Sequence, residues 1–201
     1  NPEKVTPDRL AAWRERLGIR ESDLVVTYVG SVGTWYMLDE MLRFFRKLLA
    51  VRPQAKFLFI TRHEHARIRE AAEKLGIAEK LIIQPAERDE VPELIRLGQL
   101  SVFFILPAYS KMASSPTKQG EIMALGIPVV CNSGVGDTDE IVRRFHSGYL
   151  VENWDLDAVV RQIETQDPAG SAEAIMAGAR EFFSLENGVS RYAAIYRRLM
   201  A

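Results

Sequence analysis

A lysine and a glutamate stand three residues apart in the stretch SSPTKQGEIMALGIPVV, a spacing that could serve a phosphorylated ligand. Ser115 is a favoured residue for the cap of a helix N-terminus, and Pro116 suits the first helical position. The backbone N–H groups of Thr117 and Lys118 would then open onto an anion, which the helix dipole favours there. A positively charged side chain at a helix N-terminus is unfavourable for the helix dipole, so helix stability does not explain Lys118. A bound phosphate would explain it.

Glu121 lies one helical turn after Lys118 and on the same face. A carboxylate one turn from a phosphate can accept hydrogen bonds from two adjacent ribose hydroxyls. The alternative is an exposed ion pair between the two side chains, worth about a few tenths of a kcal/mol. We favour the ligand site, because this helix follows an apolar strand and lies at the carboxyl edge of the predicted sheet.

The loop after the first predicted strand, GSVGTW, resembles a glycine-rich turn that binds phosphate, with Gly30, Ser31 and Gly33 as its contacts. It is neither the dinucleotide fingerprint, which needs G-x-G-x-x-G, nor a P-loop, because no Gly-Lys-Ser/Thr follows. A tight turn between strand and helix is the alternative. The neighbouring Trp35 and Tyr36 either line a cleft or staple the following helix.

Other chemically capable side chains have simpler explanations. Arg62 ends the second predicted strand and is a candidate phosphate ligand, with a surface ion pair as the alternative. His63 and His65 have a metal-binding spacing without a partner cluster, so we expect no metal site and read them as surface residues. The lone Cys131 excludes an internal disulfide and fits a small buried side chain. The loop at 108–114 could wrap a diphosphate or simply connect two elements.

Composition limits the classes of protein to consider. The chain has 201 residues, with 47% hydrophobic and 26% charged residues, as expected for one globular domain over 1–201. A net charge of −1 does not indicate nucleic acid or an anionic membrane as the main partner. No apolar run approaches the roughly 20 residues that span a bilayer. The first residue is Asn1 and no signal peptide opens the sequence, so we expect a fragment of something longer.

Apolar runs typical of strands alternate with amphipathic runs typical of helices, which predicts a parallel sheet covered on both faces. The predicted strands are 24–30, 55–61, 80–85, 100–107, 127–132 and 148–152. The predicted helices are 38–53, 64–77, 88–98, 115–126, 138–148, 155–166, 169–182 and 187–200. The fold class is therefore α/β, a doubly wound Rossmann-like sheet of about six strands with extra C-terminal helices. Ligands of such sheets bind beyond the carboxyl ends of the strands.

Three segments together resemble a known family. EIMALGIPVV with SPTK before it, YVGS in the first strand, and SGYLV after a helix are similar to the donor-binding, C-terminal half of GT-B glycosyltransferases of family 4, or group 1. The likeness covers roughly residues 20 to 155, and the tail VSRYAAIYRRLM is similar to the family's closing helix. The resemblance implies a retaining glycosyltransferase that acts in polysaccharide or glycan biosynthesis.

The resemblance also implies roles for particular residues. The second glutamate of the family motif, which holds the ribose, matches Glu121, whereas the first, which contacts the sugar, falls on Ala113. The family's usual basic pair is missing after the first strand, because no Lys or Arg stands between Gly30 and Arg43. Some polysaccharide-type members carry Pro-Ser/Thr-Lys on the donor helix, and Pro-Thr-Lys here looks like it. We therefore expect Lys118, with Arg62, to stabilise the leaving group.

The chemistry implied is transfer of a sugar from a nucleotide diphosphate sugar through an oxocarbenium-like transition state, with no cofactor and no metal required. The acceptor site would lie on an N-terminal domain, so this fragment alone should bind nucleotide and turn over nothing. The resemblance implies a cytoplasmic location and leaves open peripheral membrane association of the full-length protein. Two alternatives remain: a GT-B-fold sugar-nucleotide epimerase, and a noncatalytic domain that binds a nucleotide sugar or a protein.

Overall fold

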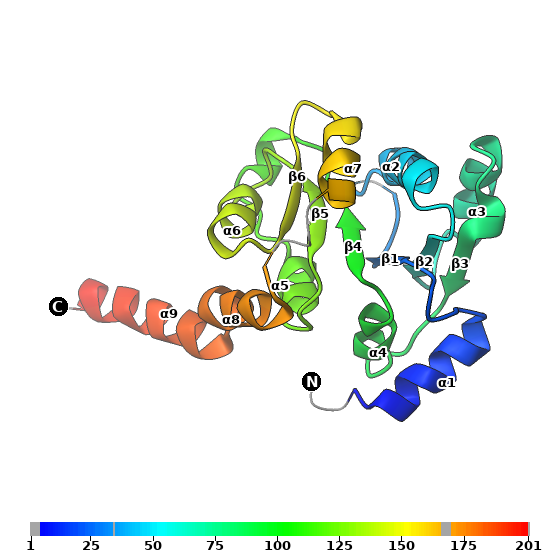
Figure 1. Cartoon of the computed structure of the whole chain (residues 1–201). Coiled ribbons are helices and arrows are strands. Elements are labelled where there is room, and N and C mark those ends of the chain that lie inside the picture. Colours follow the sequence, from blue (N-terminus) through cyan, green and yellow to red (C-terminus); the bar gives the residue numbers. More distant parts are fainter. Residues whose placement is uncertain (1–4, 34, 166–169, 201) are drawn as a thin grey trace.

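A six-stranded parallel sheet with the strand order β3-β2-β1-β4-β5-β6 forms the centre of the structure (Figure 1). The computed structural model describes residues 5–33, 35–165 and 170–200. The strands are β1 (Val25–Val29), β2 (Lys56–Ile60), β3 (Leu81–Gln84), β4 (Leu100–Phe103), β5 (Val129–Asn132) and β6 (Gly148–Val151). The predicted doubly wound sheet is confirmed, and its order reverses between β1 and β4, where ligands of such sheets bind.

Helices cover both faces of this sheet (Figure 1). They are α1 (Pro7–Leu17), α2 (Leu38–Val51), α3 (His65–Lys74), α4 (Val91–Arg96), α5 (Thr117–Met123), α6 (Thr138–Phe145), α7 (Leu156–Thr165), α8 (Ala172–Phe183) and α9 (Leu185–Met200). Helix α2 packs against α3 and α7 on one face, whereas α1 packs on α4, and α8 packs on both α5 and α6, on the other. The predicted residues 166 and 169, at the end of one helix and the start of the next, lie outside the described residues.

Short sequence signals set where the elements begin and end. The Thr6 side chain accepts a hydrogen bond from the Arg9 N–H at the start of α1, and Gly18 ends that helix at φ +62°. The strands are apolar on both sides because helices cover both faces, and the aromatic core is fully buried. Its largest members are Tyr28, Phe44, Phe45, Phe57, Phe59, Phe103 and Phe104.

The fourth strand ends earlier than the sequence predicts, at Phe103 instead of residue 107. The chain beyond it pairs with other partners. Ile105 forms an antiparallel bridge with Tyr36, and its backbone N–H and C=O both bond to the Asn132 side chain, at 2.8 and 2.9 Å. The Leu106 N–H donates to the Trp35 carbonyl at 2.8 Å. These bonds hold the loop after β1 against the segment that follows β4.

The last two helices differ in how they are packed. Helix α8 lies on α5, where a Cβ added to Gly120 would lie 2.6 Å from Cγ of Phe183. Helix α9 buries no residue and projects from the domain (Figure 1). Its exposed apolar side chains are Leu185, Val189, Tyr192, Ile195, Tyr196, Leu199 and Met200. Among the described residues, no helix is long and apolar enough to cross a membrane.

We expect Gly120→Ala to destabilise the fold by about 1–3 kcal/mol, because the new methyl group would force Phe183 and α8 away from α5. Gly188→Ala is the matched control, since Gly188 lies in α9 with no atom within 4 Å of an added Cβ. There, the helix should gain about 0.5–1 kcal/mol. Urea unfolding of the two variants measures both changes. A Gly120→Ala chain as stable as the wild type would show that α8 does not constrain α5.

Candidate functional site

The candidate site lies at the carboxyl edge of the sheet, between the end of β1 and the first turn of α5. Three hollows lie at this edge, and the first two share Val29 and Val91. The largest, about 430 Å³, is bordered by α4 and α5 and includes Val29 and Glu121. A second, of about 220 Å³, is shared by the loops after β1 and β2. A third, of about 240 Å³, lies beside the start of α5 and includes Tyr36 and Thr117.

Lys118 crosses from α5 to the end of β1 and is only 9% exposed. Its ammonium donates a hydrogen bond of 2.9 Å to the Val29 carbonyl. The same Nζ lies 3.4 Å from the ring centroid of Tyr36 and 4.6 Å from that of Tyr28, so both ring faces stabilise the cation. A Cβ added to Gly30 would lie 3.1 Å from this Nζ. The ammonium therefore lies directly beneath the glycine loop.

Burial lowers the pKa of Lys118 to about 7, and the neighbouring Glu121 carboxylate opposes that change by favouring the charged form. No carboxylate forms an ion pair with Lys118 within the described ranges. A buried ammonium without a counter-charge is costly, and an anionic ligand would supply that charge. Lys118 is thus a buried cation at this edge that an anionic ligand would stabilise.

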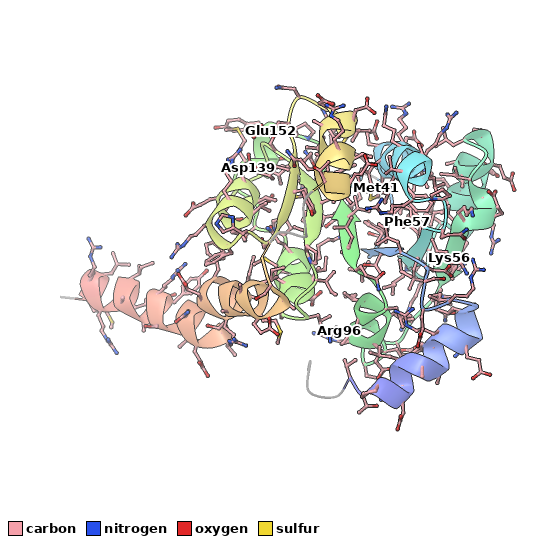
Figure 2. The ribbon with its side chains drawn as sticks, in the orientation of Figure 1. Met41, Lys56, Phe57, Arg96, Asp139 and Glu152 are labelled. Atoms are coloured by element: carbon pink, nitrogen blue, oxygen red, sulfur yellow. The ribbon has the colours of Figure 1, made fainter. Side chains whose placement is uncertain are left out.

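Glu121 is exposed and borders the 430 Å³ hollow together with Arg88 and apolar side chains of α4 and α5. It forms no ion pair with Lys118 in the described structure, so the surface-pair alternative is wrong for these two residues. Arg96, labelled in Figure 2, donates a 2.7 Å hydrogen bond from Nη1 to the carbonyl of Leu125, which borders this hollow. A free carboxylate beside an apolar hollow matches what a nucleoside needs.

The glycine loop has the backbone that its sequence predicts. Gly30 and Gly33 adopt φ of +121° and +128°, values that other residues rarely adopt. The Tyr28 hydroxyl donates a hydrogen bond to the Ser31 carbonyl, which fixes the loop above the strand. Gly30 and Ser31 line the 220 Å³ hollow together with Arg62. Gly33 borders a separate hollow with Arg67, and the phosphate role of all three loop residues stays a prediction.

Arg62 is engaged on the surface. Its Nε donates to the Ala86 carbonyl at 2.8 Å, and its Nη2 pairs with the Glu87 carboxylate at 2.6 Å. Both side chains of the pair are at least half exposed, so it contributes at most about 1 kcal/mol and can open when an anion binds. The surface ion pair proposed as the alternative is present. A phosphate role for Arg62 stays a prediction, and it would require this pair to rearrange.

The start of α5 differs from the prediction. The helix begins at Thr117, its cap is Pro116, and no side chain satisfies the cap, so Ser115 is not the N-cap residue. The reason is local: proline disfavours a helical conformation in the residue before it, and Pro116 itself is extended at ψ 109°. Ser115 and Thr117 instead border the 240 Å³ hollow.

The two histidines contact Thr61, and the cysteine is buried in the sheet. His65 Nε2 lies 2.9 Å from the Thr61 carbonyl, and the N–H of His63 donates to the Thr61 hydroxyl. Cys131 is fully buried in β5. Within the described part of the chain, no group of three or more His, Cys, Asp or Glu side chains could hold a metal ion.

Sequence reasoning missed the surroundings of Lys118. It left open whether Trp35 and Tyr36 line a cleft, and the structure shows that both do. It did not foresee that Tyr28 and Tyr36 enclose the lysine, because the three residues meet only through the fold. Nor did it foresee Lys111, whose Nζ lies 4.2 Å above the Trp35 ring. No local sequence pattern predicts that a lysine in α5 contacts two tyrosines in and after β1.

Comparison with known proteins decides the family. The family described as Glycosyl transferases group 1 matches residues 11–166. This chain belongs to that family. The expected resemblance to group 1 glycosyltransferases is thereby confirmed. The D-inositol 3-phosphate glycosyltransferase of Mycobacterium marinum is 30% identical in an alignment 197 residues long, which covers 92% of this chain and 40% of the relative. The protein of the same name from Streptomyces avermitilis is 27% identical, over 96% of this chain and 44% of the relative.

Solved structures share the fold. The Anabaena protein HepE, in complex with UDP-glucose, superposes with a TM-score of 0.76 at 19% identity, covering 96% of this chain and 53% of that one. WaaG, a glycosyltransferase involved in lipopolysaccharide biosynthesis, gives a TM-score of 0.70 at 21% identity, over 90% of this chain and 48% of WaaG. The GT-B type of fold is confirmed. The group 1 chain described here spans about half the length of the relatives it matches.

Proposed function

We propose that this group 1 domain binds the nucleotide diphosphate sugar donor of a retaining glycosyltransferase that builds a polysaccharide or glycan. The observation that carries the proposal is the pairing of Lys118 and Glu121 on one helix, at the edge where the sheet order reverses. One is a buried cation that forms no ion pair among the described residues, and the other is a free carboxylate beside an apolar hollow. A diphosphate and a ribose supply the missing partners of both.

In the proposed complex the nucleoside enters the 430 Å³ hollow and its ribose hydroxyls donate to Glu121. The diphosphate then lies over the start of α5, near the Thr117 N–H and the glycine loop. We expect Lys118 to exchange the Val29 carbonyl for a phosphate oxygen by rotation about its side-chain bonds. As the bond to the sugar breaks, negative charge grows on the leaving diphosphate, and the lysine and helix N–H groups stabilise it. No step of this scheme needs a metal or a cofactor.

The proposed enzyme needs a second domain for its acceptor. HepE and the mycobacterial relative extend well beyond the part that this chain matches. Helix α9, with its exposed apolar side chains, offers a surface for such a domain. Ala113, which stands where the family has a carboxylate, favours a second candidate function, a domain that binds a nucleotide sugar without catalysis. Incubating the longer protein with labelled nucleotide sugars separates transfer, epimerisation and simple binding.

Binding of this chain alone can be tested by calorimetry with UDP, GDP, ADP and CMP. We expect one nucleoside diphosphate to bind, and Glu121→Gln to weaken it about tenfold by losing one charge-assisted hydrogen bond to the ribose. Inorganic pyrophosphate, which has no ribose, is the matched ligand, and its affinity should change much less than that of the nucleotide. An equal loss for pyrophosphate would remove Glu121 from the ribose site, and failure of every diphosphate to bind would refute the proposed function.

A further inference from the structure

The hollow beside the start of α5 has the features of a sugar subsite, with an aromatic ring, several hydroxyl groups and one lysine in its lining. Its lining is Trp35, Tyr36, Ile105, Lys111, Ser114, Ser115, Pro116 and Thr117. It joins the proposed diphosphate site through Tyr36, which contacts the Lys118 ammonium, and through Thr117 at the first turn of α5. A group attached to the diphosphate therefore enters this hollow, and this argument rests on the proposed function.

Among the described residues that line this hollow, Lys111 alone is charged. The Lys111 ammonium lies 4.2 Å from the centroid of the Trp35 ring, and Trp35 itself is 40% exposed. No described carboxylate pairs with Lys111. Asp39 and Glu40 border a separate hollow on the other side of Trp35, where Arg67 lies with them.

The loop that carries Lys111 is held in place by the fold. The N–H groups of Lys111 and Ser114 donate to the carbonyls of Ala108 and Lys111, at 2.8 and 3.2 Å. A Cβ on Gly136 would lie 1.6 Å from the Ser114 carbonyl oxygen, so the loop after β5 supports this loop directly. These contacts fix the backbone at Lys111, whereas its ammonium is placed by the contact with the Trp35 ring.

We propose that this subsite takes a donor sugar with an acidic substituent, a uronic acid, in preference to a neutral hexose. The sugar stacks on the Trp35 ring, which Lys111 leaves to pair with the sugar carboxylate. The hydroxyls of Ser114, Ser115 and Thr117 are available to the sugar hydroxyls. With alanine at position 113, that residue places no carboxylate in the loop to repel the acidic group. The exchange replaces an exposed contact between a cation and a ring with a charge-assisted hydrogen bond.

Matched pairs of donors test this inference on the chain itself: UDP-glucose against UDP-glucuronic acid, and GDP-mannose against GDP-mannuronic acid. For the nucleotide that binds, calorimetry should show the acidic sugar binding about tenfold more tightly than the neutral one. Lys111→Gln should remove that preference, Lys111→Arg should keep it, and Ala113→Glu should reverse it. UDP or GDP itself should bind all four chains alike.

Each outcome decides something different. Equal or weaker binding of the acidic sugars overturns the uronic-acid assignment and leaves the nucleotide site intact. A preference that survives in Lys111→Gln overturns the role of Lys111. Failure of every nucleotide to bind overturns the proposed function, and the sugar subsite with it.

Discussion

Lys118→Met should weaken diphosphate binding at least about 100-fold and at the same time stabilise the fold by about 1–3 kcal/mol at pH 7. Binding falls because the buried ammonium is the cation proposed to meet the diphosphate. Stability rises because a methionine avoids the cost of burying a charge, which lowers the pKa of Lys118 to about 7, and this gain exceeds the loss of one hydrogen bond to the Val29 carbonyl. Calorimetry with UDP or GDP and urea unfolding measure the two effects.

The pH dependence gives this prediction a second readout. Free Lys118 loses its proton above about pH 7, and a bound diphosphate raises its pKa again, so binding takes up a proton and affinity falls between pH 7 and 9. Stability has the opposite sign: the unfolded lysine holds its proton up to about pH 10.4, so the free energy of unfolding rises with pH across that window. Lys118→Met should lose both trends. A variant that binds as well as the wild type would remove Lys118 from the site.

Gly136→Ala is expected to destabilise the protein by about 2–4 kcal/mol for two reasons. The new methyl group would clash with backbone atoms, and alanine is unfavourable in the left-handed conformation of this residue. Gly136 has φ +48°, and the added Cβ would lie 1.6 Å from the Ser114 carbonyl oxygen, an atom that cannot rotate away as a side chain can. The loop carrying Ser114 and Ser115 must therefore shift, and it borders the proposed sugar subsite. Affinity for the nucleotide sugar should fall more than affinity for the nucleotide.

Gly134→Ala controls for the backbone conformation alone. Gly134 lies in the same loop at φ +82°, yet an added Cβ would have no atom within 4 Å. We expect a cost of about 1 kcal/mol there and no change in the ratio of the two affinities. Thermal unfolding and calorimetry compare the variants. Equal losses for the two glycines would mean that contact with Ser114 plays no part.

The sheet was predictable because its determinants are local. Six apolar runs separated by amphipathic segments yield the strands and their parallel arrangement, and all six strands form within a few residues of the predicted bounds. The spacing of Lys118 and Glu121 likewise follows from helix periodicity. Local patterns could not predict that β4 ends at Phe103. The chain leaves the sheet there because the side chain of Asn132, distant in sequence, forms hydrogen bonds with both the N–H and the C=O of Ile105.

The sequence was enough to select candidate residues for the site, but not to predict which residues they contact. Ser115 is a good cap by type, but the proline after it moves the cap and the first helical residue by one position. The partners of Lys118 are a carbonyl and a ring from segments about 80 to 90 residues away, which only the fold brings together. The pairing of Arg62 with Glu87 depends on two adjacent loops at the sheet edge. Such contacts are properties of the tertiary structure.

A crystal structure of this chain with its preferred nucleoside diphosphate tests the central claim most directly. We expect the ribose hydroxyls within about 3.2 Å of the Glu121 carboxylate, and the Lys118 ammonium moved from the Val29 carbonyl to a phosphate oxygen. A nucleotide bound away from α5, or one whose phosphates leave Lys118 on the Val29 carbonyl, would contradict the proposed donor site.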